Sequence, residues 1–151
     1  MNKQKFFIRL YSARKLYSSE ERIIFEDALI NLQGIILIDD ICELCKIFCD
    51  DTEDEEMMFG LIHLIEQCKG QEYLRCIAKF SPNMTEAHDW AMILNKRILN
   101  SQNYFEQYAE IIVDLESNYQ TSIIELLMDV KNDNPKMFGE KVDYILEKVN
   151  G

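Results

Sequence analysis

Apolar residues recur at intervals of three and four along almost the whole chain, which is the spacing of one face of an α-helix. No stretch shows the clear two-residue alternation of a half-buried β-strand. The clearest helical sets are Phe105, Tyr108, Ile112 and Leu115; Ile123, Leu127 and Val130; and Phe138, Val142, Ile145 and Val149. The pattern therefore predicts an all-α protein.

Residues that cap helices place the expected helix starts. Three pairs fit the capping box, in which a side chain at the N-cap and one three residues later bond each other's backbone amides: Ser18 with Glu21, Thr52 with Glu55, and Asn83 with Glu86. Asn134 followed by Pro135 is typical of a helix start, and Gly34 and Gly70 are expected at helix ends. The expected starts lie near residues 19, 39, 53, 71, 84, 102, 119 and 135.

These short intervals leave room only for short connections, which favour antiparallel neighbours. We expect a single helical domain over residues 1–151, built of seven to eight short antiparallel helices stacked as α-hairpins. The interval between pairs is similar to that of helical repeats, so a small superhelical array is one possible arrangement, although no repeat consensus is legible. No apolar run reaches the roughly 20 residues that cross a bilayer.

The net charge of −11 is concentrated in two regions. The stretch from Asp39 to Glu56 carries −8, and the stretch from Ser101 to Asp133 carries −6, so the remainder of the chain is positive by 3. A field of this sign repels nucleic acid and anionic membranes and attracts cationic partners. We therefore expect neither a nucleic-acid nor a membrane partner.

The five cysteines are an odd number, and the N-terminal segment is a poor signal peptide. Both observations favour reduced thiols in the cytoplasm. Cys42, Cys45 and Cys49 form a CxxCxxxC run that could suggest zinc or redox chemistry. No second CxxC pair supplies further zinc ligands, and the run is in phase with apolar neighbours, so we expect buried, metal-free thiols.

The acidic segment at residues 50–56 does not fit a calcium loop. An EF-hand beginning at Asp50 would need glycine at its sixth position and glutamate at its twelfth, where the chain has Glu55 and Leu61. The carboxylates of residues 53–56 instead suit the first turn of a helix, where the helix dipole favours negative charge. That preference leaves Asp50 and Asp51 unexplained.

No other cluster supplies convincing catalytic chemistry. His63 and Glu66 share a helical face, but a di-iron site reverses their order and a zincin helix needs a second histidine four residues away. We expect a partly buried His63 with a polar partner, a core Trp90, and an Arg97 that pairs with a buried carboxylate such as Glu66. The chain is therefore expected to be no enzyme and to hold no cofactor or metal; a carboxylate metalloenzyme is the remote alternative.

Two acidic stripes repeat at four-residue spacing on the C-terminal helices: Glu106, Glu110 and Asp114, then Glu125, Asp129 and Asp133. Each stripe should lie opposite the apolar face of its helix and therefore in solvent. Like charges at this spacing repel each other by some tenths of a kcal/mol per pair. Either recognition of a partner or ordinary solubility would explain why that cost is tolerated.

Two segments, DDTEDEEMMFGLIHLIEQ at residues 50–67 and MTEAHDWAMILNKRILN at residues 84–100, resemble bacterial immunity protein family 30. These small, mainly helical proteins are found beside polymorphic toxins, including toxins of contact-dependent inhibition. The segments cover under a quarter of the chain. The positions that carry the resemblance are Asp50, Asp51, His63, Glu66, Trp90, Arg97 and Asn100.

The resemblance implies a protein that binds a toxin domain stoichiometrically and blocks its active site. Nuclease toxins are cationic where they grip phosphates, which agrees with an acidic binding surface. We expect a cytoplasmic, non-enzymatic protein, with a monomer favoured; the alternative is a helical-repeat adaptor that binds a basic host partner. The expected partner-binding residues are Asp50, Asp51, Glu53, Asp54, Glu56, Glu106, Glu110, Asp114, Glu125 and Asp129.

Overall fold

A computed structural model describes residues 2–151, and within that range the chain is helical with no strand. The all-α prediction is confirmed. The α-helices are α1 Lys3–Ala13, α2 Ser19–Leu32, α3 Ile41–Cys45, α4 Glu55–Ile65, α5 Gln71–Phe80, α6 His88–Leu99, α7 Phe105–Asp114, α8 Ser117–Asp133 and α9 Pro135–Asn150, and two 3-10 turns, η1 and η2, span Ile38–Asp40 and Ser81–Asn83.

The described residues form nine α-helices, rather than seven to eight, because the segment Lys3–Ala13 is also helical. Asn2 caps this first helix, since its side-chain oxygen accepts a hydrogen bond from the Gln4 amide at 3.1 Å. The chain divides into two compact units, Met1–Lys69 and Gly70–Gly151, hereafter unit 1 and unit 2. Each is described by itself.

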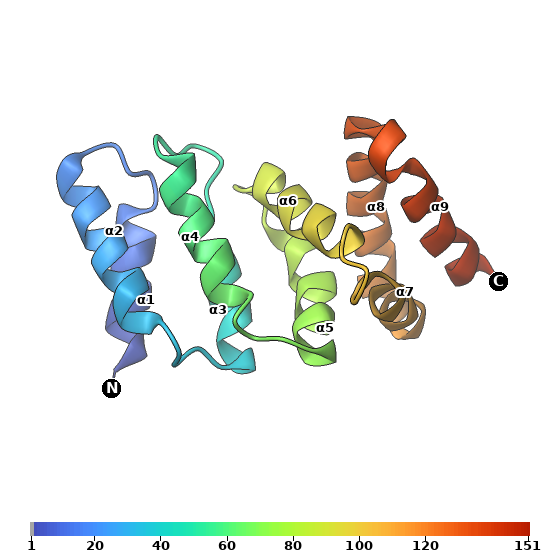
Figure 1. Cartoon of the computed structure of the whole chain (residues 1–151), viewed down its shortest axis with the longest axis horizontal. Helices are drawn as coiled ribbons and strands as arrows, with labels where there is room; N and C mark the ends of the chain where they lie inside the picture. Colours follow the sequence, from blue (N-terminus) through green and yellow to red (C-terminus); the bar gives the residue numbers. More distant parts are fainter. Residues whose placement is uncertain (1) are drawn as a thin grey trace. The chain divides into compact units, whose positions relative to one another are not determined.

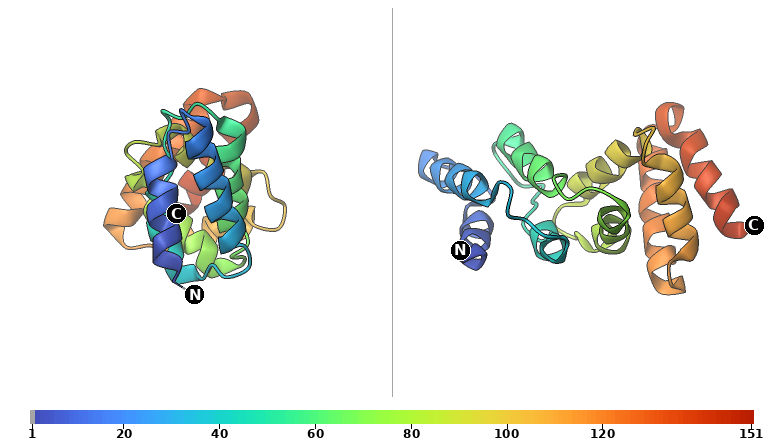
Figure 2. Two further views of the ribbon diagram at one scale, coloured as in Figure 1. Left: turned by 90° about the vertical axis from the view of Figure 1, so that its left-hand side faces the viewer. Right: turned by 60° about the horizontal axis from the view of Figure 1, so that its bottom comes forward.

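Unit 1 is built on the antiparallel hairpin of α1 and α2, whose helices lie side by side (Figures 1 and 2). The turn between them holds Leu16, which is fully buried in a left-handed conformation with φ of 55°. The predicted capping box of Ser18 and Glu21 then starts α2, with both reciprocal hydrogen bonds present. Helix α2 packs on α4, and the fully or nearly fully buried apolar side chains between these elements include Leu10, Phe25, Leu32, Leu44, Phe48, Leu61 and Ile65.

Unit 2 contains the antiparallel pair α8 and α9, with α7 beside them (Figure 2, right). The prediction for their junction is confirmed, because the Asn134 side chain accepts from the Met137 amide at 3.2 Å and Pro135 occupies the first turn. Helix α5 packs on α7 and α8, and α6 packs on α8. Trp90 lies in the core of this unit, as expected, with 4% of its surface exposed.

Two of the predicted capping boxes do not form. Helix α4 begins at Glu55 behind Asp54 as its N-cap, because the segment before it is bonded to the turn after α1 and is not helical. Helix α6 begins at His88, since the chain first makes the 3-10 turn Ser81–Asn83. Gly34 follows the end of α2 with φ of 77°, whereas Gly70, with φ of 101°, begins α5 instead of ending α4.

The interpretations of His63 and Arg97 also change. His63 is exposed on the side of α4 opposite its buried residues and lies near Phe59, with 6.3 Å between the ring centroids. Arg97 is exposed at the edge of the buried face of α6, from which its long side chain reaches solvent. Neither is the buried polar residue that the sequence suggested, and the pairing of Arg97 with Glu66 stays a prediction.

The burial predicted for the three thiols is found for two of them. Cys45 and Cys49 are buried at 3% exposure each, while Cys42 is half-buried. Helix α3 spans only Ile41–Cys45, so the three cysteines do not share one helical face. Burial raises the pKa of the Cys68 thiol, also in unit 1.

A buried polar network fixes the core of unit 2. Asn95 is completely buried; its amide donates to Ser81 Oγ at 3.0 Å and to the Ala91 carbonyl at 2.9 Å. The Tyr108 hydroxyl, also completely buried, donates to the side-chain oxygen of Asn95, and burial raises the pKa of Tyr108 above its usual range. Because each of these buried polar groups has a hydrogen-bond partner within the network, the network holds α6, α7 and the 3-10 turn η2 in one register.

We predict that Tyr108→Phe lowers the free energy of unfolding by about 1–3 kcal/mol, because it leaves the buried Asn95 oxygen without its donor. Urea denaturation followed by circular dichroism measures the change. Tyr104→Phe, at a half-buried position, is the matched control and should alter it by less than about 0.5 kcal/mol. Equal stabilities for the two variants would contradict a structural role for the network.

Candidate partner-binding surface

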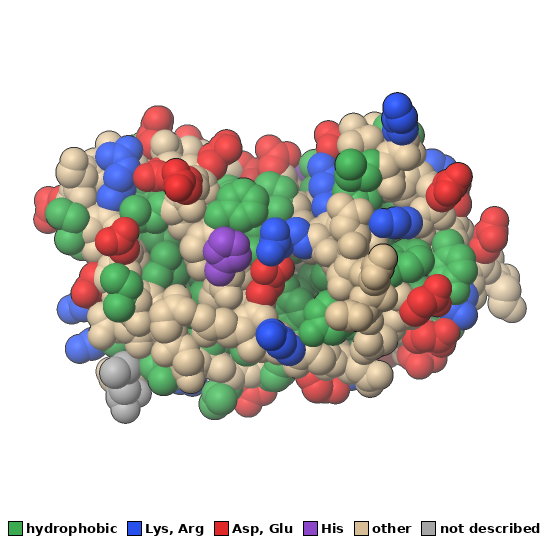
Figure 3. Space-filling model, viewed as in Figure 1, with side chains coloured by type: hydrophobic (Ala, Val, Ile, Leu, Met, Phe, Trp, Pro, Cys, Tyr) green, Lys and Arg blue, Asp and Glu red, His purple; other side chains and the backbone are tan. Residues whose placement is uncertain are grey.

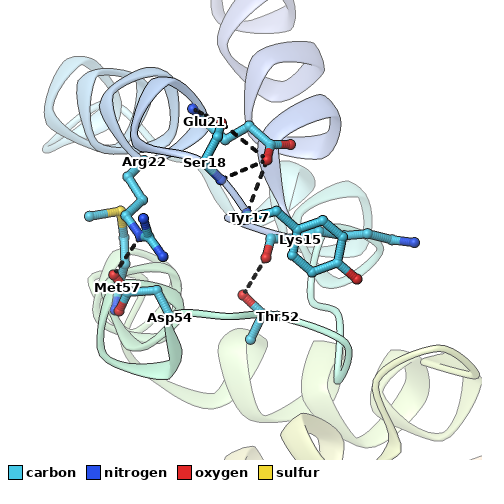
Figure 4. Close-up of polar contacts among 8 residues, drawn as sticks. All are labelled: Lys15, Tyr17, Ser18, Glu21, Arg22, Thr52, Asp54 and Met57. Atoms are coloured by element: carbon cyan, nitrogen blue, oxygen red, sulfur yellow. Dashed lines mark hydrogen bonds and ion pairs between the residues drawn. The ribbon is translucent and has the colours of Figure 1, made fainter.

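The acidic segment of residues 50–56, hereafter the acidic edge, lies in the connection from α3 to α4 and in the first turn of α4. Backbone bonding fixes its course. The Glu53 amide donates to the Lys15 carbonyl at 2.9 Å, and the Thr52 hydroxyl donates to the same oxygen at 3.4 Å (Figure 4). The edge is thereby attached to the turn between α1 and α2.

Asp54 joins two helices through its two carboxylate oxygens. One oxygen accepts from the Met57 amide at 3.0 Å and caps α4, while the other lies 3.4 Å from the Arg22 guanidinium on α2 (Figure 4). The side chain is 27% exposed. Asp54 therefore has a structural role within unit 1 as the N-cap of α4 and the partner of Arg22, whereas the sequence had placed it in the first helical turn and among the partner-binding residues.

Asp51 is also bonded within unit 1. The Tyr17 hydroxyl donates to it at 2.6 Å, and the Lys15 ammonium lies 3.7 Å away. The hydrogen bond to the carboxylate raises the pKa of Tyr17 to about 12, because ionisation would remove the donor and place two negative charges together. Tyr17 therefore remains a neutral donor throughout the physiological pH range.

The other carboxylates of the acidic edge, Asp50, Glu53, Glu55 and Glu56, are exposed. Acidic side chains gather near the upper ends of α2 and α4 in the view of Figure 3. Glu55 and Glu56 occupy the first turn of α4, where the helix dipole favours them, as predicted. Asp51 and Asp54 are thus bonded within unit 1, and five of the six carboxylates of the edge, Asp51 included, face solvent.

Beside the edge, α2 and α4 enclose a groove of about 350 Å³, hereafter the α2–α4 groove. The sequence did not indicate it, because its walls come from helices more than twenty residues apart. Its lining residues are Glu26, Leu29, Asp54, Glu56, Met57 and Gly60. A second groove, of about 230 Å³ and lined largely by apolar side chains such as Phe7, Ile8 and Tyr11, lies between α1 and α3.

The acidic stripe on α7 is partly neutralised by α9. Tyr144 donates to Glu106 at 2.7 Å, and the Lys148 ammonium lies 2.8 Å from Glu110. The hydrogen bond to Glu106 raises the pKa of Tyr144, and the bond to Glu110 raises the pKa of Lys148. Asp114, at the end of the stripe, is exposed.

The stripe on α8 is offset by α6 in the same way. His88 Nε2 lies 3.3 Å from Asp129, and the Lys96 ammonium lies 2.6 Å from Asp133. Glu125 is exposed. The repulsion expected within each stripe is therefore reduced by lysines from helices distant in the sequence, Lys148 at α7 and Lys96 at α8. Acidic and basic side chains lie side by side near α7 in Figure 3.

Across residues 2–151, no group of three or more His, Cys, Asp or Glu side chains is arranged to hold a metal ion. None of the helices described is long and apolar enough to span a membrane. The geometry instead offers surfaces: the acidic edge with its groove in unit 1, and two partly neutralised stripes in unit 2.

A protein-family model described as Immunity protein 30 matches residues 12–108, which is more than half of the chain. The match includes the acidic edge, both walls of the α2–α4 groove and the helices from α2 to α6. Most of α1 and all of α8 and α9 lie outside it. No curated protein and no solved structure matches the chain.

We predict that Asp54→Ala lowers the free energy of unfolding by about 1–2 kcal/mol, because α4 loses its N-cap and Arg22 its partner. Asp54→Asn keeps the capping oxygen and should cost less than half as much. Glu53→Ala, at the exposed neighbouring position, is the control for urea denaturation. If Asp54→Ala and Glu53→Ala unfold alike, Asp54 is not the link between these helices.

Proposed function

Because the chain belongs to the Immunity protein 30 family, we propose that it neutralises a cognate toxin domain by binding it one to one and covering its active site. Membership implies an immunity protein whose partner is a toxin protein. The single observation that supports the location of binding is the acidic edge. It lies within the residues shared with the family and directs five of its six carboxylates into solvent.

The acidic edge supports a toxin with a cationic surface, and a nuclease fits best. An enzyme that cleaves nucleic acid needs positive charge around its active site to hold phosphates. A row of carboxylates complements that charge and competes with the backbone of the substrate. Inhibition of this kind requires no catalytic group in the immunity protein, so we propose a non-enzymatic role in the cytoplasm, where the toxin would meet its substrate.

The anchored carboxylates prepare the exposed ones for binding. Asp54 holds α2 to α4, and Asp51 is bonded to Tyr17 in the turn that precedes α2. The intervening Glu53 is held through its backbone amide while its side chain stays exposed. A partner would therefore meet charges on a fixed backbone, which reduces the conformational entropy lost on association.

The stripes of unit 2 form a secondary part of the proposal. Glu106, Glu110 and Asp129 bond neighbouring helices and add to the negative field, while Asp114 and Glu125 are exposed. Charge of this kind accelerates encounter with a cationic partner even without direct contact. We propose that the toxin domain contacts unit 1 and that unit 2 contributes steering.

The test uses the triple variant Asp50→Asn, Glu53→Gln and Glu55→Gln, which leaves the anchors Asp51 and Asp54 intact. Surface charge acts mainly on association, and 0.1 M salt screens it beyond about 10 Å. We expect association with the toxin domain encoded beside this gene to slow by about tenfold at low salt, with a flatter salt dependence. Surface plasmon resonance at two ionic strengths measures both quantities.

The control variant, Glu86→Gln, Glu140→Gln and Glu147→Gln, removes the same charge from exposed positions elsewhere. It should slow association by less than about threefold, since these charges lie outside the proposed surface. Circular dichroism establishes that both variants are folded. If the two variants behave alike, the acidic edge is ordinary surface, and the stripes containing Asp114 and Glu125 become the next candidates.

A further inference from the structure

The α2–α4 groove has carboxylates at its mouth and apolar atoms on its floor. Glu26 from α2 and Glu56 from α4 are both exposed, whereas Leu29 is buried and Met57 is half-buried in the same lining. The third carboxylate of the lining, Asp54, is already bonded to Arg22 and to the start of α4. Two acidic groups in the groove are therefore left for a ligand, and the groove lining itself contains no basic residue.

A glycine lets the helices approach at this groove. A Cβ atom placed on Gly60 would lie only 2.8 Å from Leu29 Cδ1, closer than side chains normally pack. Gly60 in the interior of α4 lowers helix propensity, by roughly 1 kcal/mol relative to alanine. The close approach at Leu29 gives a packing reason for accepting that cost.

Two exposed isoleucines lie on α2 near Glu26, on the solvent face of the helix and outside the groove lining. Ile23 and Ile30 are 70% and 63% exposed, unusually high for large apolar side chains. They lie three residues before and four residues after Glu26, so all three share one face of the helix. This face is separate from the buried face of α2, which contains Phe25, Ala28, Leu29 and Leu32.

We propose that the α2–α4 groove binds one long cationic side chain, an arginine or a lysine of the toxin partner, and that the toxin surface around this side chain contacts Ile23 and Ile30 on the neighbouring solvent face of α2. This inference rests on the proposed function. The aliphatic stem of such a side chain would cover Leu29 and Met57, while its charged end would lie between Glu26 and Glu56. Arginine is the better fit, because its planar guanidinium bonds two carboxylates at once.

This arrangement is that of an interface hot spot, in which a cationic anchor enters a pocket and apolar contacts exclude water around it. It differs from the steering charge of Asp50, Glu53 and Glu55, which belong to the acidic edge but do not line the groove. A charge pair that is desolvated in a complex governs mainly dissociation, whereas solvent-exposed charges govern mainly association. The groove should therefore affect mainly the dissociation rate, and the exposed charges mainly the association rate, so that kinetic measurements separate the two contributions.

The test uses two double variants. The groove variant carries Glu26→Gln and Glu56→Gln, and the control variant carries Glu140→Gln and Glu147→Gln, which removes equal charge from exposed positions on α9. With the same toxin domain, we expect the groove variant to dissociate about 30-fold faster and the control to stay within about twofold. Ile23→Thr with Ile30→Thr should also dissociate faster without any change in charge. Replacing each surface arginine and lysine of the toxin by alanine should reveal one position whose effect disappears in the groove variant.

Each outcome is decisive. If the wild-type chain fails to bind the toxin domain, the proposed function fails and this inference fails with it. If the wild type binds but the groove variant dissociates like the control, the groove is not the anchor site, while the proposed function stands. Matching thermal unfolding of wild type and variants establishes that a faster dissociation reflects the lost contacts and not a loss of fold.

Discussion

The carboxylate of Asp54 is the interaction on which the candidate surface depends. Its two oxygens serve different helices, one as the N-cap of α4 and the other as the partner of Arg22 on α2. Without it, the first turn of α4 would lose a capping bond and the two walls of the groove would lose their polar link. Two further hydrogen bonds attach the acidic edge: the Glu53 amide donates to the Lys15 carbonyl, and the Tyr17 hydroxyl donates to Asp51. A surface selected for negative charge thus uses part of that charge to hold its own geometry.

The periodicity of apolar residues was enough to predict the fold class, because each helix buries a continuous face. Local capping chemistry was less dependable. Ser18 and Asn134 cap helices as predicted, since nothing distant competes for their bonds. Thr52 does not, because its segment is bonded to the Lys15 carbonyl, 37 residues earlier in the chain, and α4 begins only after Asp54, which caps it instead. A sequence pattern cannot reveal such a competitor, and the same limitation hid the groove, whose walls meet only after α2 and α4 pack together.

The acidic composition was also informative only in part. The sequence located the acidic edge and both stripes but treated every carboxylate as equivalent. In the folded chain they fall into two groups. Asp51, Asp54, Glu106, Glu110 and Asp129 bond other helices or turns, most of them while staying exposed, and the side chains of Glu53, Glu56, Asp114 and Glu125 lie at the surface. Negative charge in this protein therefore contributes both to internal cohesion and to the external field, and spacing along a helix does not separate the two roles.

The attachment of the acidic edge has a consequence for how immunity proteins of this kind could diverge. The bond from the Glu53 amide ends on a carbonyl oxygen, so it forms whatever side chains occupy positions 53 and 15. The exposed side chains of Glu53 and Glu55 can therefore be exchanged during evolution with little effect on the course of the backbone. A toxin that altered its surface could then be followed by compensating changes at a few outward positions. The backbone of the acidic edge would then stay the same while the preference for one toxin over another changed.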